Sequence, residues 1–147
     1  MVKLLVVVLL AGAGWYAYVH YFADSGAVST YKEFAEAWAS NRTREVSDLI
    51  SSSVMADAMG PQSFPKVLGE PLGQVRGVSF DVESETGSGT HVSVRAMQAV
   101  EFDPPGVTSI FGGASTASLS EVAELERTAD GWRVVSFSPS LASVRDQ

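Results

Sequence analysis

The chain has 147 residues, a formal net charge of −7, no cysteine and only two histidines. This length accommodates one folded domain beside a short terminal segment. Because cysteine is absent, the chain forms no disulfide and offers no thiolate ligand or cysteine nucleophile, and we expect no metal and no other cofactor. The excess of acidic residues would repel nucleic acid, so we expect no nucleic-acid partner.

An apolar segment at residues 4–22 precedes everything else and contains no Asp, Glu, Lys or Arg. As a helix it would be about 28 Å long, close to the hydrocarbon thickness of a bilayer. Lys3 precedes the segment and Asp24 follows it, which favours a cytoplasmic N-terminus. We therefore predict that residues 1–23 are a single-pass anchor in the inner or plasma membrane, with a periplasmic or extracellular C-terminal domain.

Two other interpretations of this segment stay open. It could be a cleaved signal peptide, with Lys3 as the basic region and Ala11-Gly12-Ala13 as a small-residue cleavage site. It could also be a buried core helix, because the strictly aliphatic run is short. The composition, with three lysines beside seven arginines, is typical of a bacterium with a GC-rich genome.

A folded domain is expected at residues 30–139, after a polar connector at 24–29. Its first helix is predicted to start with a capping box in which Thr30 caps the helix and Glu33 reaches back. The apolar side chains that follow are spaced i, i+3, i+4 and i+7 on one helix face, namely Tyr31, Phe34, Ala35 and Trp38.

A second helix is predicted from Thr43 or Arg44, with a weaker extension to Met59. Gly60 and Pro61 would end it. Residues 62–74 are rich in proline and glycine and are predicted to form a loop with one helical turn near 64–68.

From Val75 onward the apolar period changes from helical spacing to two, which predicts antiparallel strands joined by glycine-rich turns. Pro139 is expected to end the last strand and to leave a loose tail at 140–147. The expected strands are a first one from residue 75 to a turn at 86–89, and three more at 91–102, 115–127 and 132–137.

The stretch at residues 128–137, Thr-Ala-Asp-Gly-Trp-Arg-Val-Val-Ser-Phe, resembles the last hairpin of the NTF2-like (cystatin-like α+β cone) superfamily. The resemblance covers about residues 29–138, although only this ten-residue stretch is distinctive. It implies an α+β fold in which two or three helices pack on a curved antiparallel sheet of four or more strands. The superfamily includes pocket enzymes similar to ketosteroid isomerase and membrane-anchored assembly domains of secretion systems, and an N-terminal anchor favours the second group.

Gln98 and Glu121 are polar residues in the apolar phase of their strands, so both side chains are predicted to point into the concave face of the sheet, within reach of Tyr31. A carboxylate there would be desolvated and its pKa raised, which makes Glu121 a weak candidate for a general acid or base. In the alternative, a β-bulge between Leu119 and Val122 turns Glu121 outward, and Gln98 only satisfies a backbone group.

Together these features indicate a membrane-anchored extracytoplasmic domain that acts as a protein- or ligand-binding or assembly module of the bacterial envelope. The alternative is a small-pocket enzyme of the isomerase or dehydratase type that uses the inward carboxylate. A homodimer or an envelope partner is expected to dock on the outer sheet face, where the strand phase places Met97, Ala99, Val135 and Phe137.

Overall fold

The computed structural model describes residues 25–69, 73–103 and 114–146. Within these ranges no helix is long and apolar enough to cross a membrane. The segment at 4–22, for which a membrane span is predicted, lies outside them.

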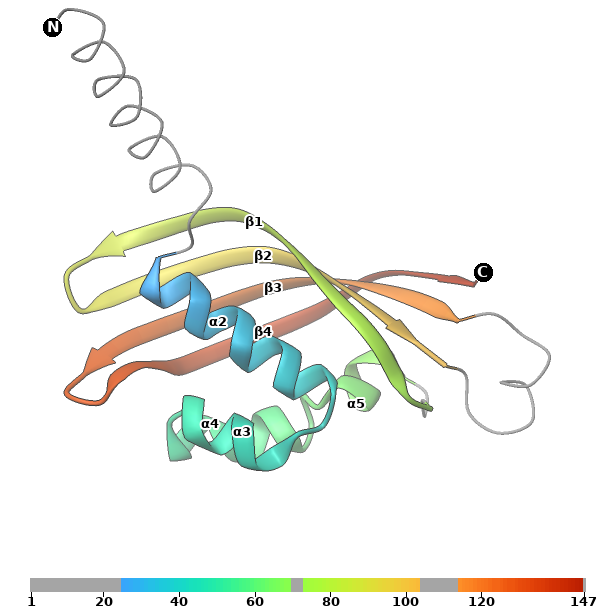
Figure 1. The fold of residues 1–147 in the computed structure, drawn as a ribbon, viewed down its shortest axis with the longest axis horizontal. Coiled ribbons are helices and arrows are strands. Elements are labelled where there is room, and N and C mark those ends of the chain that lie inside the picture. The colour runs from blue at the N-terminus through green and yellow to red at the C-terminus, as the bar shows by residue number, and fades with distance from the viewer. Residues whose placement is uncertain (1–24, 70–72, 104–113, 147) are drawn as a thin grey trace, which may run out of the picture.

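The described chain is an α+β domain built on one open antiparallel sheet, which confirms the predicted class (Figure 1). The sheet is a meander in which each strand pairs with the next one in sequence. Its strands are β1 (Val75–Ser88), β2 (His91–Phe102), β3 (Ser115–Thr128) and β4 (Gly131–Asp146).

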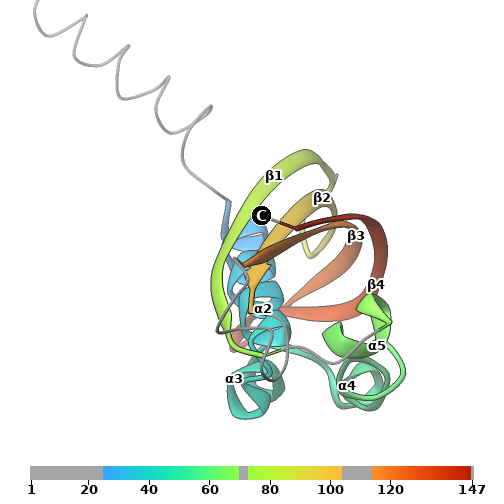
Figure 2. The same ribbon diagram turned by 90° about the vertical axis from the view of Figure 1, so that its right-hand side faces the viewer.

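The longest described helix, α2 (Gly26–Ala39), lies across the concave face and contacts all four strands (Figures 1 and 2). Seen from the end in Figure 2, the sheet curls around this helix. Three short helices follow, namely α3 (Thr43–Leu49), α4 (Ser52–Met59) and α5 (Phe64–Leu68). In the view of Figure 1, α3 and α4 lie below α2, and α5 lies near its C-terminal end. The described helices therefore all lie on one side of the sheet, and none of them covers the convex side.

Helix α2 begins five residues earlier than the sequence pattern predicts, so the capping box at Thr30 and the connector at 24–29 were wrong. Ser25 has an extended backbone, and its hydroxyl accepts a hydrogen bond from the amide of Val28 at 3.1 Å. A serine in that position satisfies one of the free amides of the first turn. Thr30 consequently lies inside the helix.

The predicted second helix is interrupted at Ile50, which separates α3 from α4. Ile50 has an extended backbone and forms an isolated bridge with Val134, while the Ser51 amide donates to the Val134 carbonyl at 3.0 Å. Breaking the helix places the buried Ile50 side chain in the core, so tertiary packing overrides the local helical pattern. The helical turn predicted near 64–68 is confirmed as α5.

Strand β4 does not end near Phe137, and the prediction of a loose tail from residue 140 was wrong. The strand continues to Asp146, which pairs with Ser115 at the far end of β3. Pro139 is tolerated because β4 lies at the edge of the sheet, where a missing amide hydrogen need not cost a ladder bond.

Two register shifts in the β3–β4 pairing leave Val135 and Ala142 as extra residues on β4. Each such bulge reverses the inward–outward alternation of the residues beyond it. Phe137 consequently points inward and is buried, so its predicted place on the outer face was wrong.

Aromatic rings fill the space between the helices and the sheet. The Phe137 ring meets those of Phe34 and Trp38 edge to face, with centroids 4.8 and 5.0 Å apart, and the contacts continue through Phe64 to Phe102. The indole nitrogen of Trp38 donates to two backbone carbonyls at 3.0 Å, which satisfies its one polar atom. These contacts make the concave side a packed core at this end of the sheet.

Candidate functional site

Gln98 and Glu121 both point into the concave face, as the strand phase predicts, and each is 0 % exposed. The reason is that β2 and β3 pair without a register shift along their whole length. The alternative in which a bulge in β3 turns Glu121 outward is therefore wrong, since the bulges beside this strand lie on β4.

Tyr31 reaches the same space from α2, and its hydroxyl donates a short hydrogen bond to Oε1 of Glu121. Its ring packs edge to face against Phe80 of β1, with centroids 5.7 Å apart, and the side chain is fully buried. The structure thus brings the predicted partners Tyr31 and Glu121 into direct contact across 90 positions of sequence.

Burial raises the pKa of Glu121 to about 8, and the hydrogen bond from Tyr31 opposes this increase only in part. Burial also raises the pKa of Tyr31 above its usual value, and the charge of Glu121 and the shared hydrogen bond raise it further. Both groups are therefore predominantly neutral at pH 7. A carboxylic acid in that state is a hydrogen-bond donor and a poor base.

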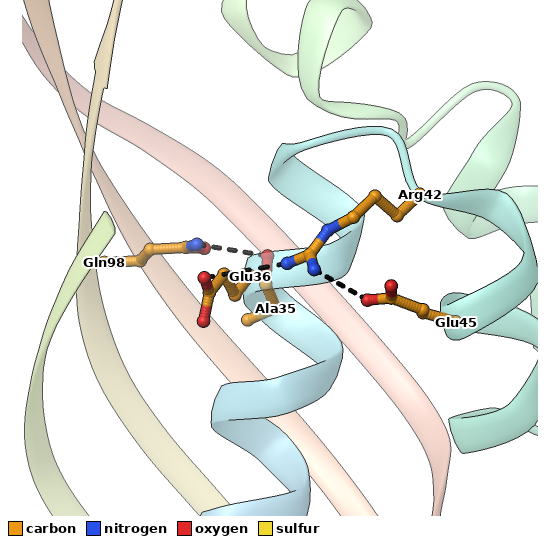
Figure 3. Close-up of polar contacts among 5 residues, drawn as sticks. All are labelled: Ala35, Glu36, Arg42, Glu45 and Gln98. Atoms are coloured by element: carbon orange, nitrogen blue, oxygen red, sulfur yellow. Dashed lines mark hydrogen bonds and ion pairs between the residues drawn. The ribbon is translucent and has the colours of Figure 1, made fainter. Parts of the chain in front are cut away.

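Gln98 connects the second strand to the same helix, because its Nε2 donates to the Ala35 carbonyl at 3.1 Å (Figure 3). Ala35 lies four residues after Tyr31 and so on the same face of α2. The interpretation that Gln98 satisfies a backbone group is confirmed.

Two polar atoms of this cluster have no hydrogen-bond partner although they are buried, namely Oε1 of Gln98 and Oε2 of Glu121. An unpaired buried acceptor costs about 1–3 kcal/mol. Among the residues that the structure describes, these two are the buried side-chain polar atoms without a hydrogen-bond partner, so their position needs a physical explanation.

The cluster has no visible connection to solvent within the part of the chain that the structure describes. Surface cavities of about 370, 520 and 280 Å³ occur elsewhere, and none is lined by Tyr31, Gln98 or Glu121. A substrate would need access to the carboxyl group before the group could act on it. The three residues are therefore placed together, but in a closed interior.

A separate cluster, which is charged, lies at the junction of α2 and α3 and was not predicted. Arg42 forms ion pairs with Glu36 of α2 at 3.6 Å and with Glu45 of α3 at 2.8 Å (Figure 3). These residues line the cavity of about 370 Å³ together with Glu33, Asp48 and Leu49. The turn after α2 brings acids of α2 and α3 together, and the apolar spacing of either helix cannot predict this contact.

This junction does not form a metal centre. Among the residues that the structure describes, no three His, Cys, Asp or Glu side chains are grouped so that they could hold a metal ion. The paired side chains are also about half exposed, so the ion pairs are screened by solvent and contribute little to stability.

Fold and site together define an α+β domain with a packed concave face and a carboxyl group enclosed within it. No family model matches the sequence, and a search of curated proteins finds no match.

Proposed function

We propose that this protein is a membrane-anchored, extracytoplasmic binding module of the bacterial envelope, and that its domain has an NTF2-like fold. The observation that carries the proposal is the packed concave face. A domain whose interior is occupied by its own side chains must present its binding surface on the outside. The apolar segment at 4–22 and the charge asymmetry around it support the anchor and the orientation.

The NTF2-like assignment is supported by the way the long first helix of the described chain lies in a curved antiparallel sheet (Figure 2). It is also supported by the position of the Gly131–Trp132 motif at the start of the last strand. Both features match what the resemblance implies for this superfamily.

The alternative function, isomerase or dehydratase chemistry in the concave face, has one observation in its favour. The raised pKa of Glu121 is typical of catalytic carboxyl groups. However, Tyr31, Gln98 and Glu121 are completely buried, and buried networks also perturb pKa values without any catalytic role. The binding function is therefore the better supported of the two.

We assign the binding surface to the convex face of the sheet and its partner to a protein, either a second copy of this chain or one envelope protein. None of the described helices covers this face (Figures 1 and 2). Short side chains cross its middle in one row from β1 to β4, where the strand pairing aligns Ser79, Ala99, Ser118 and Ser143. Short side chains let a second backbone approach closely, and a surface cavity of about 280 Å³ is lined by two residues of this row, Ser79 and Ala99.

The orientation is tested by fusing a reporter enzyme that is active only outside the cytoplasm to the C-terminus of the full chain. We expect activity in intact cells, and a fusion to a cytoplasm-specific reporter serves as the control. Activity of only the cytoplasmic reporter would exclude an extracytoplasmic domain.

The surface is tested by cysteine cross-linking, for which the chain has no background because it lacks cysteine. Ser118→Cys places a thiol on the convex face, and Ser47→Cys places a matched thiol on exposed α3. In native membranes we expect Ser118→Cys to form a defined adduct, either with itself or with one envelope protein. Equal cross-linking from both positions would remove the convex face from the proposal.

A further inference from the structure

We propose that Glu121 carries a proton in the folded domain and that this proton closes a hydrogen-bonded clasp between α2 and the sheet. The inference concerns the stability of the domain and is independent of the binding function proposed above.

The strand register makes Gln98 and Glu121 diagonal neighbours. Glu121 pairs with Ala96 and Gln98 pairs with Leu119, so the two polar residues are offset by two positions on the same inward face. Diagonal neighbours in an antiparallel pair are about 7–8 Å apart, a distance that two long side chains can bridge.

The two unpaired atoms are Oε1 of Gln98 and Oε2 of Glu121, and both are acceptors if the carboxyl group is ionised. Two acceptors cannot bond to each other, but a proton on Oε2 converts one of them into a donor. The bond from Oε2–H of Glu121 to Oε1 of Gln98 would then satisfy both atoms at once. A single proton resolves the conflict without any water or ligand.

With this bond in place the clasp is continuous from the helix to the sheet and back. Tyr31 donates from α2 to Glu121 on β3, Glu121 donates to Gln98 on β2, and Gln98 donates to the Ala35 carbonyl one turn further along α2. The clasp therefore joins two turns of the helix to the two central strands.

The groups that surround Glu121 indicate that its own proton, and not that of a neighbour, sets the pH at which the clasp opens. Tyr31 is the titratable group that α2 directs at it, while the residues paired with Glu121 are Ala96 on β2 and Pro139 on β4. β1 contributes Phe80 against the tyrosine ring, and its charged residue in the inward phase is the exposed Glu85, which accepts from the Ser25 hydroxyl at the start of α2. Arg95 and Glu124, the nearest charged positions on β2 and β3, have the outward phase.

The expected consequence is a clasp that is closed in acidic and neutral medium and opens as the medium becomes alkaline. Burial with the opposing Tyr31 bond places the pKa of Glu121 at about 8, so ionisation above that value removes the donor to Gln98. The buried carboxylate between α2 and the sheet would then keep the hydrogen bond from Tyr31 but have no donor for Oε2, which is unfavourable for a buried charge.

The test is a carbon NMR titration of the full chain in detergent micelles, with labelled glutamate and sequential assignment of the Glu121 carboxyl carbon. We expect its midpoint near pH 8 in the unmodified chain. A midpoint close to the ordinary glutamate pKa of 4.5 would overturn the proposal without any variant.

Two variants distinguish the effect of the clasp hydrogen bonds on the pKa of Glu121 from the effect of burial alone. Gln98→Leu removes the acceptor of the Glu121 proton, so we expect the midpoint to fall by about one pH unit, the equivalent of one hydrogen bond. Tyr31→Phe removes a donor that favours the ionised form, so the midpoint should rise. A midpoint that stays constant or rises in Gln98→Leu would show that the two side chains are not bonded, and would refute the clasp.

Discussion

Replacing Glu121 with glutamine should remove most of the pH dependence of folding that this residue causes. The amide keeps the shape of the carboxylic acid, and it can accept from Tyr31 and donate to Gln98, but it does not titrate. In the native chain, the folded state retains a proton that the unfolded state releases above its ordinary pKa of 4.5. Stability from this proton is fully present below pH 4.5 and is lost as the pH rises to about 8.

The size of the effect follows from the two pKa values. The pKa of Glu121 is 4.5 in the unfolded state and about 8 in the folded state. The linkage of protonation to folding then predicts that the free energy of unfolding of the native chain falls by about 3–4 kcal/mol between pH 5 and pH 8 because of this group alone. Glu121→Gln lacks this contribution, so its stability relative to the native chain should rise by the same amount over that interval. The relative stability should level off above pH 8.

The assay is urea unfolding of the full chain in detergent at several pH values, followed by the fluorescence of its tryptophans. Glu124→Gln, an exposed change on the same strand, is the matched control and should keep the native pH dependence. If Glu121→Gln and Glu124→Gln show the same slope as the native chain, the buried carboxyl group is ionised in the folded state and the reasoning fails.

Three further changes test the fold. Gly87→Ala should destabilise the β1–β2 hairpin by about 2 kcal/mol or more, because φ is +120° and a Cβ would lie 2.3 Å from the His91 carbonyl oxygen. Gly89→Ala, where φ is +68° and a Cβ would meet no atom, should cost only about 1 kcal/mol. Equal losses of stability in urea unfolding would contradict this expectation. Trp38→Ala should cost about 3–5 kcal/mol by opening a cavity among the core rings, and a loss below 1 kcal/mol would contradict the packing. Arg42→Ala should change the thermal unfolding midpoint very little, since its ion pairs are exposed and worth at most about 1 kcal/mol.

The strand pattern predicted the inward site well because β2 and β3 are central and regularly paired. Period-two alternation holds along both strands, so the positions of Gln98 and Glu121 could be inferred from phase alone. The bounds of β2 were also predicted without error, since a turn and a proline pair frame it. Tyr31 was placed correctly by its helical spacing, even though the start of its helix was not.

The wrong predictions share a physical cause, which is that tertiary contacts overrode local signals. Ile50 leaves the helical pattern to bridge Val134, and Ser25 provides a cap that precedes the expected one. Bulges at Val135 and Ala142 change which side chains of β4 point inward, and the residue types in that stretch do not predict them. The sequence also could not predict that the site is closed to solvent, because whether side chains fill a concave face depends on their packing in three dimensions.

The irregular edges of the sheet have a consequence for self-association. Both outer strands carry extra residues, Arg76 and Glu83 on β1 and Val135 and Ala142 on β4, and β4 also contains Pro139. Bulges, charges and proline at an edge interrupt the row of free amides and carbonyls on which another strand would polymerise. Copies of this domain at high concentration would therefore resist fibre growth through their edges, even though the sheet is open.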